Sequence, residues 1–416
     1  MTMPQALGSV GSRPRVLIGA YAASPGEEPE AGAGWALATA AAADHDVWLV
    51  TRPRFRTAIE DALAQDPELA ARLTVVFHDL APRIVALKRR NIDLYWYYVA
   101  WQYALGGVAR RLHRELRFDV VHHATWANDW LHAGVSHVRG VPFVWGPVGG
   151  ASAVPLRRLG RWLGRRGLLT ELVRGALTRL PRRVWGDRNA SRAAVVVAQN
   201  HEVAARFRRA RRVVVEPNAA LDRYEEVLAA LGPIPPPPND VPTAVFVGRL
   251  VAWKGVRLAV EALTRPAAAA WHLDIYGDGY EREALESLVQ RHGLGDRVAF
   301  LGHRPRTEVL AAFARADAML FPSMHDQAGW VAAEASSLGC PVVCLPLGGP
   351  HLLAGVNARV VSLEGDIPEN LAEALAGTRE QPGVPHDTWA RDRLVPRVRQ
   401  WYADAMAGRA DAAEER

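Results

Sequence analysis

The sequence predicts an α/β fold with two doubly wound parallel sheets, one in each half of the chain. Strand-like apolar runs alternate with helical segments in both halves, which is the pattern of a parallel sheet covered by helices on both faces. The alternation stops at residues 232–242, where six prolines in eleven residues favour a stiff linker. A chain of 416 residues is also longer than one hydrophobic core normally supports. We therefore expect two domains.

Short apolar runs that end in polar or glycine-containing loops mark the strands of both halves. In the first half we expect strands at residues 15–21, 46–50, 73–77, 119–122, 142–145, 193–198 and 213–216, with helices at 35–43 and 104–116. In the second half we expect strands at 244–247, 271–276, 297–301, 318–321 and 341–345, with helices at 256–263, 281–291, 308–316 and around Glu334.

The domain boundaries follow from this pattern. We expect an N-terminal domain over residues 1–225, a proline-rich linker over 226–242 and a C-terminal domain over 243–387. A final helix over 388–408 is expected to pack back on the N-terminal domain. The two cysteines, Cys340 and Cys344, have no zinc-ligand spacing and are expected to be buried free thiols, as in a reducing compartment.

Basic charge is concentrated in one segment. Residues 156–192 hold eleven arginines against Glu171 and Asp187, which is +9 in a chain whose net charge is +6. Apolar side chains recur there at helical spacing, namely Leu169, Leu172, Val173, Leu177 and Leu180. A basic amphipathic helix indicates contact with an anionic membrane surface, and a charged helix packed on its own domain is the alternative. No base-reading motif or aromatic platform accompanies the charge, so nucleic acid is not expected as a partner.

Neither a signal peptide nor an apolar stretch of membrane-spanning length is recognisable. We expect a cytoplasmic protein that is peripheral, at most, on the inner face of the cell membrane. Of the 50 basic residues only Lys88 and Lys254 are lysines. A lysine that is retained despite this preference for arginine is a candidate for a specific role.

Lys254 belongs to the segment VGRLVAWKG, which lies between a predicted strand and a predicted helix. The spacing is not that of a P-loop. It places Arg249 and Lys254 at the carboxyl end of a parallel strand, where ligands of such sheets bind. An arginine fork and a lysine ammonium suit a phosphate group, whereas a solvated loop with two ordinary cations is the alternative.

Residues 321–350, FPSMHDQAGWVAAEASSLGCPVVCLPLGGP, combine a polar loop, a helix and a glycine turn. Asp326 lies just before the expected helix, and Glu334 lies two turns inside it. A helix start offers free N–H groups to a phosphate, and a carboxylate beyond it can accept hydrogen bonds from sugar hydroxyls. This layout suits a nucleotide-sugar diphosphate. As a simpler alternative, Asp326 is a helix N-cap or first-turn acid.

The segments GRLVAWKG (248–255), IYGDG (275–279), FLG (300–302) and the block 321–350 follow in the order and spacing of the family-4 glycosyltransferases, which the chain resembles over essentially its whole length. Looser matches are residues 32–35, 119–123, 145–150 and 217–218. The resemblance implies the GT-B fold, with two Rossmann-like domains facing each other across a cleft. It also implies retaining transfer of a sugar from a nucleotide-diphosphate sugar.

The resemblance implies roles for individual positions. Arg249 and Lys254 would bind the donor diphosphate and support its departure as the leaving group. Glu334 would accept a hydrogen bond from the donor ribose, and Asp326, where the family usually has glutamate, would contact the transferred sugar. The family then has glycine, an aromatic residue and glycine, whereas this chain has Gln327, Ala328 and Gly329. Gln327, Ala328 and Gly329 are expected to bind the donor, and further donor-binding candidates are Gly248, Gly277 and Gly302.

Candidates in the first half are less specific. His122 and His123 end a strand, so one of them is a candidate for a catalytic contact in the cleft, and a structural role is equally expected. Trp126 and Asp129 follow in the same loop, where each can line an acceptor site or pack within the domain. The loop glycines Gly32 and Gly34 allow a ligand to approach the backbone closely.

The function expected from these observations is retaining transfer of a hexosyl or related group to a glycan, lipid-linked or small-molecule acceptor, within bacterial cell-envelope polysaccharide or glycoconjugate synthesis. No metal or other cofactor is expected to be required, and the nucleotide sugar is a co-substrate. Two alternatives stay open. One is a non-catalytic partner subunit with the same fold, and the other is a nucleotide-sugar epimerase.

Overall fold

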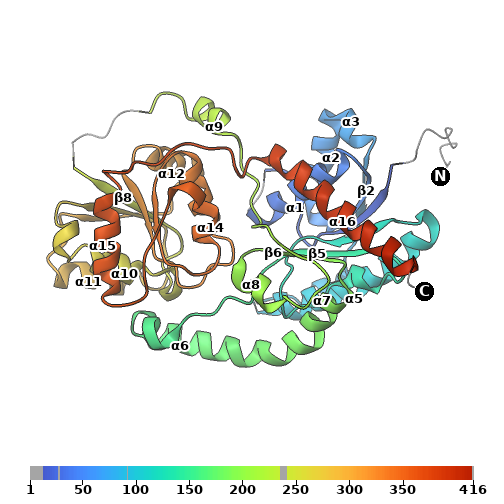
Figure 1. Cartoon of the computed structure of the whole chain (residues 1–416), viewed down its shortest axis with the longest axis horizontal. Helices are drawn as coiled ribbons and strands as arrows, with labels where there is room; N and C mark the ends of the chain where they lie inside the picture. The colour runs from blue at the N-terminus through green and yellow to red at the C-terminus, as the bar shows by residue number, and fades with distance from the viewer. Residues whose placement is uncertain (1–12, 27–28, 91, 235–240, 415–416) are drawn as a thin grey trace.

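The computed structural model contains two parallel sheets and describes residues 13–26, 29–90, 92–234 and 241–414 (Figure 1). The strands of the first sheet lie in the order β3 (Leu73–Phe77), β2 (Asp46–Thr51), β1 (Arg15–Gly19), β4 (Val120–His123), β5 (Phe143–Val148), β6 (Val195–Ala198) and β7 (Val213–Val215). Those of the second lie in the order β10 (Val298–Gly302), β9 (His272–Tyr276), β8 (Thr243–Val247), β11 (Ala318–Phe321), β12 (Val342–Cys344) and β13 (Ala358–Val360). The predicted fold of two parallel α/β sheets is confirmed.

Helices cover both sheets. Those before β8 are α1 (Pro29–Ala42), α2 (Arg56–Gln65), α3 (Pro67–Ala70), α4 (Pro82–Val85), α5 (Asp93–Leu116), α6 (Leu156–Pro181), α7 (Asp187–Arg192), α8 (His201–Arg206) and α9 (Tyr224–Leu231). Those after it are α10 (Val256–Ala262), α11 (Arg282–Arg291), α12 (Arg306–Phe313), α13 (Trp330–Ser337), α14 (Pro350–Ala354), α15 (Ile367–Gly377) and α16 (Leu394–Glu414). We call the sheet β1–β7 with its packed helices the N-terminal unit, and the sheet β8–β13 with its own the C-terminal unit.

The strands form where the sequence carries continuous apolar runs, because a parallel sheet covered on both faces buries both sides of its strands. All four residues of β4, β6 and β11 are buried. Strand β13 was not predicted, because none of its three residues is fully buried and they provide no such run. Cys340 and Cys344 are buried and free, as predicted.

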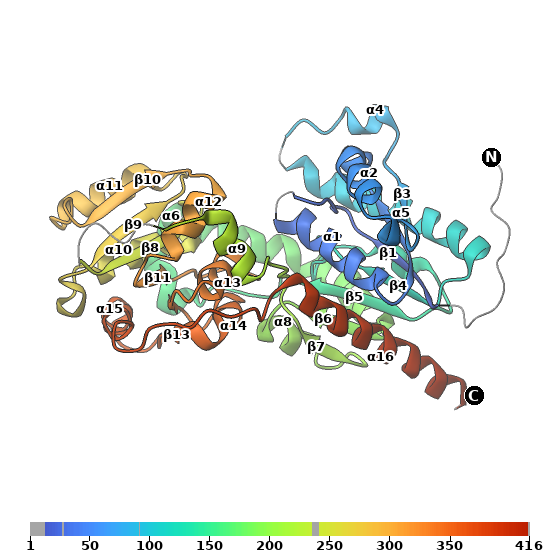
Figure 2. The same cartoon turned by 90° about the horizontal axis from the view of Figure 1, so that it is seen from above.

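The last helix returns to the N-terminal unit. Figures 1 and 2 show α16 lying along the first sheet, away from the second sheet that precedes it in the chain. Val398, Trp401 and Tyr402 are buried in the core on one face of that sheet. Arg397 adds an ion pair with Glu216, the residue after β7, at 2.6 Å. The chain therefore crosses between the two units more than once.

Helix α6 also crosses between the units, along the lower side of the molecule in Figure 1. Its first turns pack into the core of the C-terminal unit through Leu159, Trp162 and Leu163. The indole Nε1 of Trp162 donates to Glu261 at 2.9 Å, and the helix bends at Gly164. Beyond its end, the chain is anchored to the N-terminal unit. Part of the predicted linker, residues 235–240, lies outside the described residues.

Candidate active site

The carboxyl ends of β8, β9 and β10 meet through glycines. Gly248 donates its N–H to the carbonyl of Tyr276 at 3.0 Å, and Gly277 donates to Gly302 at 2.8 Å. Gly277 has φ +128°, and a Cβ there would lie 2.0 Å from the carbonyl oxygen of Gly248. Only glycine allows this approach of the backbones. The structure therefore brings these three predicted positions together.

The turn after β8 is joined to the loop between β11 and α13 (residues 322–329), which we call the β11–α13 loop. Lys254 Nζ lies 2.5 Å from Asp326 Oδ2, and Ser323 Oγ donates to the same carboxylate oxygen at 3.1 Å. Gly255, with φ +76°, lets the turn approach closely, because a Cβ there would lie 2.0 Å from the carbonyl oxygen of Pro322. Two residues predicted to act on one ligand are thus direct neighbours.

Arg249 and Glu334 differ in their surroundings. The side chain of Arg249 is exposed, and it makes no hydrogen bond or ion pair within the described part of the chain. Glu334, on α13, accepts from Arg306 Nε at 2.8 Å. Burial raises the pKa of Glu334, and the neighbouring guanidinium of Arg306 opposes that shift. One free cation and one paired carboxylate are therefore available to a ligand.

A cavity of about 650 Å³ lies between the two units and includes part of this site. Gly26 and Gly32 line it from the N-terminal unit, and Arg306, Trp330 and Glu334 line it from the C-terminal unit. A volume of this size lies within the range of small-molecule sites. Gly32 therefore occupies the place predicted for a ligand loop.

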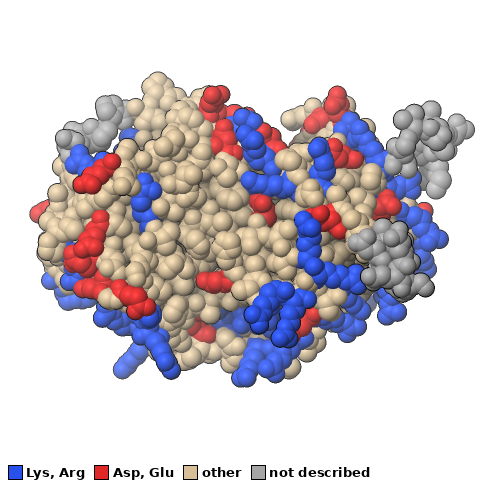
Figure 3. Space-filling model, in the orientation of Figure 1, with Lys and Arg blue, Asp and Glu red and all other residues tan. Residues whose placement is uncertain are grey.

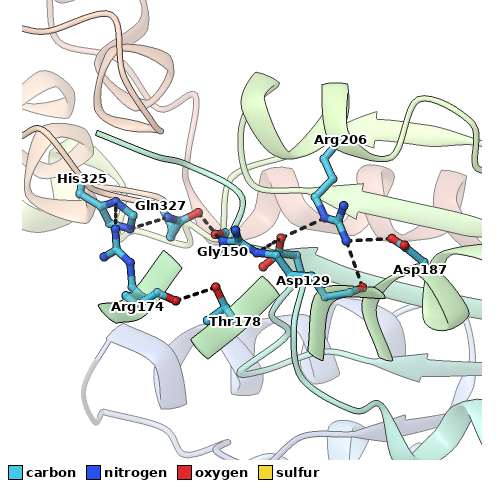
Figure 4. A network of polar contacts seen from close by, with 9 residues as sticks. Asp129, Gly150, Arg174, Thr178, Asp187, Arg206, His325 and Gln327 are labelled. Carbon is cyan, nitrogen blue, oxygen red and sulfur yellow. Dashed lines mark hydrogen bonds and ion pairs between the residues drawn. The ribbon is translucent and has the colours of Figure 1, made fainter. Parts of the chain in front are cut away.

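The three residues after Asp326 connect the β11–α13 loop to the N-terminal unit. Gln327 Oε1 accepts from the N–H of Gly150 at 2.7 Å (Figure 4). The backbone carbonyl oxygen of Gln327 accepts from Asn200 Nδ2 at 2.9 Å. Ala328 packs beside a small apolar cluster, and Gly329 adopts φ +83° at the start of α13. In this arrangement, the side chain of Gln327 contacts protein, so the loop is held by both units.

His325, which precedes Asp326, was not predicted. Its ring Nδ1 lies 2.7 Å from a guanidinium nitrogen of Arg174 on α6 (Figure 4). Arg174 also pairs with Glu171. Burial, and then the charge of Arg174, lower the pKa of His325 to about 3. The ring is therefore neutral at physiological pH. Its partners come from a helix about 150 residues earlier, so no local signal in the sequence reveals them.

His122 and His123 do not reach the cavity. His122 is fully buried, with Nε2 donating to the carbonyl of Gly146 at 2.7 Å and Nδ1 accepting from Tyr402 at 2.9 Å. His123 is also buried and lies 3.1 Å from the hydroxyl of Tyr98. Burial lowers the pKa of the two rings to about 4 and about 3. The burial of both rings favours the structural alternative, because strand β4 is central and covered on both faces, and a catalytic contact of either stays a prediction.

Gly34 and Trp126 support the loop around Gly32. A Cβ at Gly34 would lie 2.2 Å from a backbone oxygen of the segment after β1, so this glycine serves helix packing. Trp126 donates its backbone N–H to Glu30 at 2.5 Å, and Asn218 lies 3.3 Å from the other oxygen of that carboxylate. Burial raises the pKa of Glu30. Glu30 was not predicted, although its place in the first turn after a glycine loop is a usable signal.

Asp129 is a structural acid and does not line the cavity. Its carboxylate is fully buried and pairs with Arg182 at 2.9 Å and Arg206 at 3.0 Å. These arginines follow α6 and end α8, so the cluster anchors the far end of α6 to the N-terminal unit. The structure therefore favours packing within the domain, and not an acceptor contact, as the role of Asp129.

Comparison with known proteins agrees with this geometry. Residues 241–380 match the family described as glycosyl transferases group 1. The 2-deoxystreptamine glucosyltransferase of Streptomyces kanamyceticus is 35% identical over 170 residues, which cover 36% of this chain and 44% of that protein. The glycogen synthase of Mycobacterium tuberculosis is 30% identical over 272 residues, 60% of either protein. The chain thus spans less than two thirds of the length of these relatives.

Solved structures share the fold over nearly the whole chain. Sucrose-phosphate synthase from Thermosynechococcus elongatus superposes with a TM-score of 0.58 at 20% identity, covering 97% of this chain and 99% of that one. A trehalose-6-phosphate structure from E. coli, bound with UDP-2-fluoro glucose, has a TM-score of 0.53 at 12% identity and covers 95% of each chain. Residues 241–380 thus resemble the glycosyl transferases group 1, and the whole chain has the GT-B fold of these solved structures.

Proposed function

We propose that this protein transfers a sugar, with retention of anomeric configuration, from a nucleotide-diphosphate sugar to an acceptor held by the N-terminal unit. The observation that carries the proposal is the contact of Lys254 with Asp326, five residues after the unpaired cation Arg249. The two cations match the charge of a diphosphate, and the carboxylate adds an acceptor for sugar hydroxyls.

Departure of the nucleoside diphosphate places negative charge on its oxygens, and fixed cations lower the energy of that state. Arg249 can donate two parallel hydrogen bonds to a phosphate, and Lys254 acts as a point charge. A lysine ammonium has three N–H donors, so Lys254 can donate to a phosphate while it keeps Asp326. Lys254 would then link the diphosphate to the group that contacts the sugar.

Glu334 suits the ribose of the donor. Its carboxylate lines the interdomain cavity, and Arg306 holds it at 2.8 Å. The charge of Arg306 favours the ionised carboxylate, which accepts hydrogen bonds from hydroxyls. The relatives are named for acceptors as different as an aminocyclitol and glycogen, so a glycan, a lipid-linked sugar or a small molecule remains within the proposal.

The test is a thermal-shift panel of UDP, GDP, dTDP and ADP, followed by the corresponding nucleotide sugars. A ligand that binds the folded state raises Tm as its concentration exceeds Kd. We expect one diphosphate to stabilise the protein, and its sugar nucleotide to release that diphosphate when an acceptor is added. If no diphosphate in the panel raises Tm, the proposal is wrong. Turnover of the donor without an acceptor would favour an epimerase.

We also propose that α6 contacts an anionic membrane surface. Its outward apolar residues are unusually exposed, with Leu169 at 62%, Leu177 at 71% and Leu180 at 68%. Lys and Arg gather along the lower edge of the molecule in Figure 3, the side on which Figure 1 shows α6. Exposed leucines with surrounding arginines match a bilayer interface with anionic lipid. No helix in the described residues is long and apolar enough to span a bilayer.

Co-sedimentation with vesicles tests this contact. We expect binding to phosphatidylglycerol-containing vesicles and little binding to phosphatidylcholine alone. Leu177→Asp should abolish binding, whereas Val356→Asp, at a position 74% exposed in the C-terminal unit, should not. Equal binding of both variants would exclude α6 as the contact.

A further inference from the structure

Two side chains that flank Asp326 face each other with their hydrogen-bonding groups. His325 Nε2 and Gln327 Nε2 lie 3.2 Å apart in the β11–α13 loop (Figure 4). Each side chain has a second partner that restricts its chemistry. The identity of those partners determines where the hydrogens lie.

The proton of His325 is assigned by Arg174. A guanidinium only donates hydrogen bonds, so His325 Nδ1, 2.7 Å from Arg174, must accept. The ring is neutral and carries one proton, because burial lowers its pKa to about 3. That proton therefore lies on Nε2, and it points at Gln327.

The amide of Gln327 is assigned by Gly150. A backbone N–H only donates, so the amide group 2.7 Å from Gly150 N must be the carbonyl oxygen Oε1. The NH2 group of Gln327 then points at His325. Two donors therefore face each other, and in the described part of the chain neither of them contacts an oxygen.

The alternative assignments do not remove the conflict. The other tautomer of His325 would direct its N–H at the guanidinium of Arg174, because the nearest carboxylate oxygen, that of Glu171, is 3.8 Å from this nitrogen and too far to accept. The reversed amide would direct the NH2 group of Gln327 at the N–H of Gly150. Each change removes the conflict between His325 and Gln327 but creates a new pair of facing donors, at Arg174 in the first case and at Gly150 in the second. A part-buried donor without an acceptor destabilises the protein, so the pair is suited to an oxygen supplied by a ligand.

We propose that His325 Nε2–H and Gln327 Nε2–H together bind one oxygen of the nucleotide sugar, either of its diphosphate or of a sugar hydroxyl. The inference rests on the proposed function, since Asp326 between them is the residue proposed to contact the sugar. The side chain of His325 is 12% exposed, so it is not fully closed off from solvent. Gln327 is held by the N-terminal unit, so the two-donor site is complete only when both units are in contact.

Calorimetric titration of two variants tests the site. His325→Phe keeps the ring and removes its nitrogens, and Gln327→Met keeps the chain length and removes the amide. His292→Phe and Gln290→Met make the same changes at exposed positions of the same unit. The ligands are the diphosphate that stabilises the wild-type protein and its sugar nucleotide.

We expect each site variant to bind the sugar nucleotide about 5–20-fold more weakly than wild type, as for loss of one hydrogen bond, and the control variants to bind it unchanged. An equal loss for the free diphosphate identifies a phosphate oxygen, and a loss confined to the sugar nucleotide identifies a sugar hydroxyl. The double variant should lose less than the sum of both effects, because one oxygen is shared.

The inference is overturned if a folded His325→Phe or Gln327→Met protein binds both ligands as tightly as wild type does. Either variant alone can give this result, so the test can still be made if one of the two variants does not fold. A wild-type protein that binds none of the diphosphates overturns the proposed function, and the inference falls with it. The two failures are therefore distinguishable.

Discussion

Lys254 and Asp326 form an ion pair, with Nζ 2.5 Å from Oδ2, that joins the turn after β8 to the β11–α13 loop. Both side chains remain partly exposed, at 16% and 18%. The pair thus fixes the positions of two loops while both groups stay within reach of a ligand. In the proposed function the cation serves the leaving diphosphate and the carboxylate serves the sugar, so the two roles can be separated by mutation.

Asp326→Asn should separate binding from turnover. The variant loses a negative charge beside the proposed phosphate site, so we expect its affinity for the nucleoside diphosphate to stay equal or rise up to about tenfold. Sugar transfer should fall by about 100-fold or more, because the sugar loses its positioning group. Calorimetry and diphosphate release measure the two quantities. A variant that transfers sugar at the wild-type rate would remove Asp326 from the mechanism.

Asp129→Ala should destabilise the fold without weakening nucleotide binding. The change leaves Arg182 and Arg206 without their buried carboxylate, and breaking a buried pair costs about 3–5 kcal/mol. Asp187→Ala is the matched control, because that side chain is 55% exposed and also pairs with Arg206. An exposed pair contributes at most about 1 kcal/mol. Urea denaturation that gave equal losses for both variants would contradict this account.

His122→Phe tests the structural role of the first strand-end histidine. The variant removes the hydrogen bonds to Gly146 and Tyr402 and leaves their buried groups unpaired, so the free energy of unfolding should fall by about 1–3 kcal/mol. Affinity for the diphosphate and the rate of transfer by the remaining folded protein should be unchanged. A loss of transfer rate without a loss of stability would favour the catalytic interpretation.

Glu216 should make stability depend on pH. Burial raises its pKa from 4.5 to about 7, although Arg397 opposes the shift. Between these values the folded protein binds more protons than the unfolded chain, so the free energy of unfolding falls as pH rises. Glu216→Gln lacks this contribution, so its stability relative to wild type should increase by about 1–3 kcal/mol between pH 4.5 and 8. Parallel pH profiles for the two proteins would show that Glu216 is not shifted.

Much of the fold could be predicted because buried parallel strands are continuous apolar runs. The path of α6 could not. Its arginines and leucines indicate an amphipathic helix, but they do not show which of the two units buries Trp162. The indole of Trp162 donates to Glu261, which is 99 residues away. The short strand β13 carries too little apolar surface to be recognised. Helix α5 begins at Asp93, earlier than predicted, because its first turns are rich in aromatic residues that are not specific to helices.

The candidate site could be predicted where one segment carries the chemistry. Lys254 and Asp326 were expected near one ligand, and the structure places them in contact. His122 could not be assigned from the strand end, because its burial depends on Tyr402, which is 280 residues away. The facing donors of His325 and Gln327 arise only from partners on α6 and in the turn after β5. Contacts between distant segments are therefore what the sequence alone could not reveal.

The most direct test of the central claim compares the two lysines of this chain. Calorimetry should measure the affinity of Lys254→Ala and Lys88→Ala for the nucleoside diphosphate that stabilises the wild-type protein. Lys254→Ala should bind it at least about tenfold more weakly, because a charge-assisted contact to phosphate is lost. Lys88→Ala, which changes a residue of the N-terminal unit beside Tyr97, should bind as wild type does. Wild-type affinity in Lys254→Ala, or an equal loss in both variants, would contradict the proposed donor site.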